Sequence, residues 1–263
     1  MIIGIDHLII ACEDPAAAAA DLEARVGLIA AGGGRHEGMG TFNRIIWLAD
    51  AYLELIGIDD REAALRHPLG AGVARVLDER GGGFVGYALL DGGELEQTVH
   101  ALHGIGSHIG PAIAGSRTRP DGETAEWWTA MPERVGPDGP PFLIQHAYSG
   151  AEWGPGALAE RRAFVHPLGS PAILARLDIA TDDPPSLAAD YAAELGLEFW
   201  AVSDLAVCTV GRHVIRLQPR GRMPVPAVIT LGAEVDVPAA VELLGVRFDV
   251  ERVDLPLPAP NLA

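Results

Sequence analysis

The sequence is poor in cysteine and has no long apolar run. Only two cysteines occur among 263 residues, and neither Cys12 nor Cys208 belongs to a Cys-x-x-Cys pair. This argues against a zinc knuckle or a thioredoxin-like site, and both thiols are expected to be buried and unpaired. No window approaches the roughly 18–20 unbroken apolar residues of a membrane span. Membrane insertion is therefore not expected.

Basic residues are also scarce. Lys and Arg number 19 against 36 Asp and Glu, and the formal net charge is −17. An acidic surface repels phosphate backbones, so nucleic-acid binding is not expected. The first residues lack the basic region of a signal peptide, and the hydrophobic share of 49% excludes a disordered chain. We therefore expect a folded, cytoplasmic protein.

The chain contains a pattern of short elements that repeats. Apolar residues alternate over 3–10, and Asp14-Pro15 is a typical start for the helix expected over 16–26. Strands are expected near 35–38, 41–48 and 52–58, with the glycines at 32–34 in a turn. The order is β-α-β-β-β.

The same order is expected twice more, over 84–146 and over 173–218, and a truncated fourth copy is expected as a strand at 227–234, a helix at 238–244 and a strand at 246–250. An isolated copy cannot bury its own sheet face, so the copies should pack in pairs. The fold class is α+β. The predicted organisation is a paired unit over 1–149 (modules 1–60 and 83–147), a linker without periodicity over 150–170, and a degenerate pair over 171–263.

A βαβββ repeat that begins with Asp6-His7-Leu8 and closes its first copy with Tyr52-Leu53-Glu54-Leu55-Ile56 resembles the vicinal-oxygen-chelate superfamily. This superfamily includes glyoxalase I, extradiol dioxygenases, methylmalonyl-CoA epimerase and the bleomycin resistance proteins. The segments 34–43, 117–122 and 141–144 resemble its glyoxalase-like domain subgroup in particular. The resemblance spans roughly residues 3–220 and implies open, curved sheets with helices outside. It is less specific for the reaction, because one fold hosts many chemistries.

The resemblance also implies a metal site. In such proteins the first and last strands of a module offer inward ligands, and these positions hold His7 and Glu54. Imidazole and carboxylate together suit Zn, Fe, Mn, Ni or Co. By alternation, His7 should share a face with Ile5 and Ile9, and Glu54 should share one with Tyr52 and Ile56.

The second module departs from the superfamily pattern. Its first-strand position falls near Gly86-Tyr87, and its last-strand position falls on Gln145, beside His146. Four-ligand coordination is therefore not supported. A third ligand or a proton-transfer group remains to be chosen among Gln145, His146 and His36, and only one of the two neighbours on the strand can point inward.

Other polar and aromatic side chains are candidates for contacts with the substrate. An arginine can clamp a carboxylate, an aromatic ring can form a pocket wall, and small polar side chains can donate to a ligand. The candidates are Thr41, Asn43, Tyr87, Arg117 and Trp127.

Together these features predict a divalent-metal-dependent, glyoxalase-like enzyme that acts on a small oxygenated molecule, by lyase, isomerase or dioxygenase chemistry. The alternative is a metal-free protein that binds and sequesters a small molecule, as resistance proteins of the superfamily do. The expected partner is a small-molecule substrate. A homodimer is compatible with the sequence, because such modules pair within or between chains.

Overall fold

The computed structural model describes residues 1–119, 121–235 and 240–254. The first module follows the predicted order, and its helix begins and ends where the sequence indicates. Oδ1 of Asp14 accepts bonds from the backbone N–H groups of Ala16 and Ala17, at 2.9 and 3.1 Å, and Gly27 ends the helix with φ of 79°. The elements are β1 (Ile2–Ala11), α1 (Pro15–Val26), β2 (Gly32–His36), β3 (Thr41–Trp47) and β4 (Tyr52–Ile58).

The turn expected at the three glycines 32–34 is instead the start of β2. Gly33 and Gly34 have φ of 135° and 157°, and an added Cβ would lie 2.3 Å from Asn43 O and 2.2 Å from Thr118 O, respectively. These residues must be glycine because β2 is squeezed between β3 and β6. The prediction of a strand over 35–38 was therefore displaced toward the C-terminus.

The second module is β5 (Gly83–Asp91), α4 (Leu95–Gly104), β6 (Ile113–Thr118), β7 (Thr124–Ala130) and β8 (Phe142–His146). Between the modules lie two helices that the sequence analysis did not predict, α2 (Arg61–Leu65) and α3 (Pro68–Arg80). The two modules close one barrel, in the order β1-β4-β3-β2-β6-β7-β8-β5. Closure comes from antiparallel pairing of β1 with β5 and of β2 with β6.

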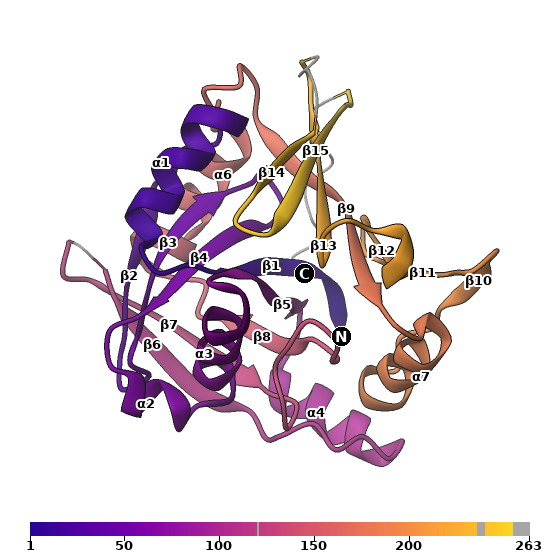
Figure 1. The fold of residues 1–263 in the computed structure, drawn as a ribbon. Coiled ribbons are helices and arrows are strands. Elements are labelled where there is room, and N and C mark those ends of the chain that lie inside the picture. The colour runs from indigo at the N-terminus through magenta and orange to yellow at the C-terminus, as the bar shows by residue number, and fades with distance from the viewer. Residues whose placement is uncertain (120, 236–239, 255–263) are drawn as a thin grey trace.

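A second sheet stands beside the barrel (Figure 1), with the strand order β10-β11-β12-β9-β13-β15-β14. Its elements are β9 (Ala172–Thr181), α7 (Pro184–Leu195), β10 (Trp200–Val202), β11 (Leu205–Val210), β12 (His213–Pro219), η1 (Arg220–Arg222), β13 (Ala227–Ala233), β14 (Val241–Leu243) and β15 (Val246–Arg252).

One expectation for the C-terminal half was wrong, and one segment has more secondary structure than predicted. The helix expected over 238–244 is the strand β14 at Val241–Leu243, while residues 238 and 239 lie outside the described part. The linker over 150–170 carries two helices, α5 (Gly150–Trp153) and α6 (Pro155–Ala163). Helix α6 buries none of its residues, so its sequence has little of the apolar periodicity that marks a buried helix.

The largest apolar core joins the barrel to its surroundings. It contains Leu8 and Leu53 from the outer face of the barrel, Leu22 from α1, Leu95 from α4 and Leu177 from the second sheet. A separate core fills the end of the barrel interior that faces α3, where Ile9 and Ile56 pack against Val73 of this helix. Helix α3 thus closes this end of the barrel, and the polar side chains gather on the side of this core away from α3.

Candidate functional site

A cavity of about 150 Å³ lies inside the barrel. Its walls come from strands of both modules and from α5, and most of the polar side chains in it are buried. The lining includes His7, His36, Asn43, Tyr52, Glu54, Arg117, Trp127, Phe142, Ile144, His146, Glu152 and Trp153.

A β-bulge in β1 places His7 at this cavity and brings its neighbour Asp6 against the ring of His7. The pairing with β5 shifts between Ile5 and His7, which leaves Asp6 as an extra residue. Ile5 packs in the core outside the barrel and Ile9 in the core inside it. The expectation that Ile5 shares the face of His7 was therefore wrong. Because of the bulge, the carboxylate of Asp6 reaches the imidazole of His7, with Oδ2 and Nδ1 2.7 Å apart.

Glu54 lies at the centre of the polar cluster and shares the inward face of β4 with Tyr52 and Ile56, as predicted. Its Oε2 lies 3.6 Å from Nε2 of His7, and its Oε1 lies 3.4 Å from Nε2 of His36. The amide of Asn43 donates to Oε1 at 2.6 Å. The 3.6 Å separation from His7 is too long for a hydrogen bond, so Asn43 supplies the one short contact to this carboxylate among the described residues.

His36 is held as a neutral imidazole. Burial is the main reason that its pKa falls to about 4, although Glu54 opposes the shift. Its Nδ1 lies 2.7 Å from the hydroxyl of Thr41, and its Nε2 lies 3.2 Å from the donating amide nitrogen of Asn43. We infer that Nδ1 carries the proton and donates to Thr41, and that the lone pair of Nε2 accepts from the Asn43 amide at the cavity wall.

Asp6 bridges two histidines from different modules. Besides His7, its carboxylate contacts Nε2 of His146, at 3.0 and 3.1 Å from its two oxygens. Burial by itself would raise the pKa of Asp6, but the contacts with His146 and His7 outweigh burial and hold it below its usual range. Because Asp6 is ionised, His7 Nδ1 and His146 Nε2 must donate to it. In the neutral form of each ring, the other nitrogen then carries no proton and has a free lone pair.

Helix α5, in the segment predicted to be a linker without periodicity, contributes two side chains to the cavity. The indole of Trp153 stacks on His146 with ring centroids 3.4 Å apart. Glu152 accepts a hydrogen bond from Arg117 at 2.5 Å. Sequence reasoning missed both residues, because a four-residue helix has no periodicity to detect.

The predicted site residues divide into two groups. The cavity brings together His7, His36, Asn43, Glu54, Arg117, Trp127 and His146, and Thr41 lies behind His36. Gln145 lies on the opposite face of β8, where its Oε1 accepts a bond from Leu95 N at the start of α4. Tyr87 packs outside the barrel near Tyr191. The placement of Gln145 and Tyr87 in the site was therefore wrong, and the choice between Gln145 and His146 is decided by the strand alternation.

The positions in the second module that correspond to His7 and Glu54 hold apolar residues. His7 pairs directly with Ala88 of β5. In the first module His7 pairs with Tyr52, two residues before Glu54, and in the second Ala88 pairs with Phe142, two residues before Ile144. We infer that Ala88 and Ile144 occupy these positions, not Gly86-Tyr87 and Gln145. Neither side chain can bind a metal.

The donor types of the first module fit a divalent metal. His7 Nε2, His36 Nε2 and the Glu54 carboxylate face one another, and the carbonyl oxygen Oδ1 of Asn43 is buried with no hydrogen-bond partner among the described residues. The carboxylate of Asp6 on the far nitrogen of His7 is the outer contact that metal-bound histidines commonly have. Within the described ranges, no group of three or more His, Cys, Asp or Glu side chains is placed as a finished metal site. Coordination would require these side chains to draw together around a common point.

Residues 5–195 match the family described as glyoxalase-like domain. The chain belongs to this family. No curated protein matches the sequence. Among solved structures, a hypothetical protein from Staphylococcus aureus is similar with a TM-score of 0.78 and 14% identity, over 96% of this chain and 100% of the other.

A triple mutant of 4-hydroxymandelate synthase from Streptomyces coelicolor is similar with a TM-score of 0.55 and 13% identity, over 89% of this chain and 72% of the other. Methylmalonyl-CoA epimerase from the same organism matches 56% of this glyoxalase-like chain and 99% of its own length, at 17% identity and a TM-score of 0.42. The likenesses to the Staphylococcus aureus protein and to the synthase support the fold alone. In the described part of the chain, no helix is long and apolar enough to cross a membrane.

Proposed function

We propose that this glyoxalase-like protein is a divalent-metal-dependent enzyme that acts on a small oxygenated organic molecule. One observation carries the proposal: each oxygen of the buried Glu54 carboxylate faces one imidazole Nε2, from His7 on one side and His36 on the other. Both nitrogens are inferred to be unprotonated, so that each carries a lone pair. Three electron-rich groups that face one another in an apolar enclosure are stabilised by a cation.

The surrounding residues prepare this ligand set. Asp6 fixes the tautomer and the orientation of the His7 ring, and stacking on Tyr52 with centroids 4.5 Å apart holds its plane. Thr41 does the same for His36. A metal bound by His7, His36 and Glu54 would polarise substrate oxygens and stabilise the negative charge that develops on them.

His146 is suited to move a proton. Its Nε2 donates to Asp6, and its Nδ1 is buried with no hydrogen-bond partner in the described part of the chain. A neutral imidazole oriented by a carboxylate on one nitrogen can accept a proton on the other. We assign Nδ1 of His146 as the general base toward a substrate C–H or O–H, with Asp6 as the residue that positions it.

The small cavity limits the substrate. A volume of about 150 Å³ with walls of Phe142, Ile144 and Trp127 has room for a molecule of a few non-hydrogen atoms. The charge of Arg117 is taken up by Glu152, so we expect no strongly anionic group to be held there. Lyase, isomerase and dioxygenase chemistry would each use the metal to bind oxygens of the substrate, so the three reaction types remain open.

Elemental analysis of untagged protein tests the metal. We expect near-stoichiometric Zn, Fe, Mn, Ni or Co in the wild type, loss of the metal in Glu54→Gln, and retention in Glu62→Gln, a matched change at an exposed position. The metal-loaded protein is then screened with compounds that carry two vicinal oxygens. Absence of metal from the wild type after reconstitution with each ion, or equal metal in both variants, would overturn the proposal.

The second candidate is a metal-free binding protein. It is favoured by the apolar side chains of Ala88 and Ile144 at the second-module positions, which leave half of the barrel without ligands. In that case chelator-treated protein would bind the same small molecules with unchanged affinity. A chelator-induced loss of binding would exclude it.

A further inference from the structure

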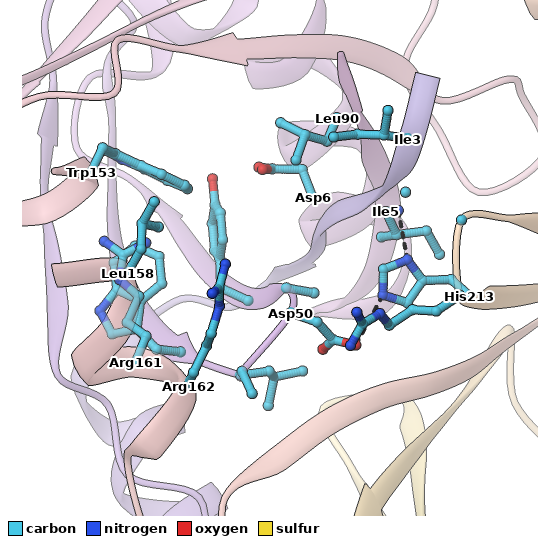
Figure 2. A pocket seen from close by; sticks show the side chains of 18 of the residues that line it. Ile3, Ile5, Asp6, Asp50, Leu90, Trp153, Leu158, Arg161, Arg162 and His213 are labelled. Atoms are coloured by element: carbon cyan, nitrogen blue, oxygen red, sulfur yellow. Dashed lines mark hydrogen bonds and ion pairs between the residues drawn. The ribbon is translucent and has the colours of Figure 1, made fainter. Parts of the chain in front are cut away.

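A second and larger cavity, of about 640 Å³, lies outside the barrel site. It is bounded by the first half of β1, the start of β4, helix α6 and the turn before β12 (Figure 2). Tyr52 and Trp153 line both cavities and form part of the wall between them. This volume falls in the range of roughly 300–1,000 Å³ that small-molecule sites occupy.

One side of this cavity is apolar. Ile3, Ile5 and Leu90 lie together across the cavity from Trp153 and Leu158 of the α5–α6 segment (Figure 2). Aliphatic and aromatic walls around an open space of this size favour the burial of an apolar ligand body.

Two consecutive arginines of α6 line the other side. The guanidinium of Arg161 lies over the ring of Trp47, 3.3 Å from its centroid, and 4.5 Å from that of Trp153. Burial lowers the pKa of Arg161 to about 10, which leaves it charged at neutral pH. The rings hold Arg161 in place, and cation–π contacts of this kind order the side chain before any ligand arrives.

Arg162 differs from its neighbour because its charge is not used. The half-buried side chain extends from α6 into the cavity (Figure 2), and it has no ion pair, hydrogen bond or ring contact within residues 1–119, 121–235 and 240–254. The two acidic side chains of the lining are both occupied. Asp50 contacts His213 and Leu174 N, and Asp6 contacts His7 and His146.

We propose that this cavity is a second ligand site, for an amphipathic organic anion whose carboxylate, sulfonate or phosphate pairs with Arg162 and whose apolar body packs on the wall of Ile3, Ile5 and Leu90. The net charge of −17 gives the chain no long-range attraction for anions. The guanidinium of Arg162 beside an apolar wall would instead bind an anion through a short-range, charge-assisted contact. This proposal does not rest on metal binding in the barrel.

Fluorescence of 8-anilinonaphthalene-1-sulfonate, an aromatic sulfonate, tests the site on the full chain. We expect saturable enhancement with the wild type and about tenfold weaker binding with Arg162→Gln, the loss of roughly one charge-assisted contact. Arg66→Gln, at an exposed arginine paired with Glu62, is the matched control and should bind as the wild type does. Octanoate should displace the probe, whereas octanol at the same concentration should displace it far less.

Two further variants decide where the probe binds. Ala49→Phe places a ring in the larger cavity without a change in charge and should weaken binding, while Glu54→Gln in the barrel should leave it unchanged. Circular dichroism checks that each variant is folded. Absence of saturable binding, equal binding by Arg162→Gln and the wild type, or loss of binding in Glu54→Gln alone would overturn the proposal, and none of these results depends on the metal content.

Discussion

The indole of Trp153 stacks on the imidazole of His146, with ring centroids 3.4 Å apart and planes within 14°. The two residues come from different parts of the fold, the short helix α5 and the last strand of the second module. Trp153 also contacts Trp47 and Tyr52 of the first module. One side chain from the segment between the barrel and the second sheet therefore locks the two modules together above the polar cluster.

We expect Trp153→Ala to lower the free energy of unfolding by about 3–5 kcal/mol, because it removes a large buried ring that no neighbour can replace. Urea denaturation followed by circular dichroism measures this. Trp200→Ala is the matched control, because Trp200 is 51% exposed on β10, and it should change the stability by no more than about 0.5 kcal/mol. Equal losses for the two variants would contradict the structural role of α5.

Glu152→Gln should destabilise the fold by about 3–5 kcal/mol, because it leaves the buried guanidinium of Arg117 without its carboxylate partner. A double variant, Arg117→Met with Glu152→Met, removes both charges and should recover much of the loss. Chemical denaturation of the three proteins gives the comparison. If the double variant is as unstable as Glu152→Gln, the ion pair itself, and not the unpaired charge, carries the stability.

The free energy of unfolding of chelator-treated protein should decrease as the pH falls from about 7 to about 4. The pKa of His36 is lowered to about 4 by burial, so the unfolded chain takes up a proton in this interval and the folded chain does not. The full effect is about 3 kcal/mol from this residue. His36→Gln should flatten the dependence over this range, and an unchanged slope would show that His36 is not buried as a neutral ring.

Asp6→Asn should weaken metal binding by about 10–100-fold while the fold is retained, because the amide cannot orient His7 and His146 as a carboxylate does. Titration with a competing chelator measures the affinity. Asp14→Asn, at the N-cap of α1 outside the site, is the control, because asparagine caps a helix about as well as aspartate. Unchanged affinity in Asp6→Asn would remove Asp6 from the proposed site.

The helix limits, the strand faces and the repeated module could be predicted from the sequence, because the patterns that indicate them are local. Asp14-Pro15 and Gly27 set the limits of α1, and strict alternation placed Glu54 beside Tyr52 on the inner face of β4. The unit of four strands and a helix was visible for the same reason. Each copy must expose one apolar face for a partner.

Only the tertiary structure decided which residues meet at the site. The alternation of β1 predicted Asp6 and His7 on opposite faces, but a bulge opposite β5 lets the Asp6 carboxylate contact His7 and His146, both of which line the cavity, and no local signal marks the bulge. The inward face of β8 belongs to His146, and Gln145 points to the other face, where its Oε1 accepts a hydrogen bond from Leu95 N at the start of α4.

Glu152 and Trp153 reach the cavity because the short segment between β8 and β9 folds back over the barrel. The sequence by itself therefore determined the modules, their caps and the inward position of Glu54. The strand register and the return of the α5–α6 segment over the barrel determined which side chains surround Glu54. Both depend on contacts between residues far apart in the chain, which the local sequence does not encode.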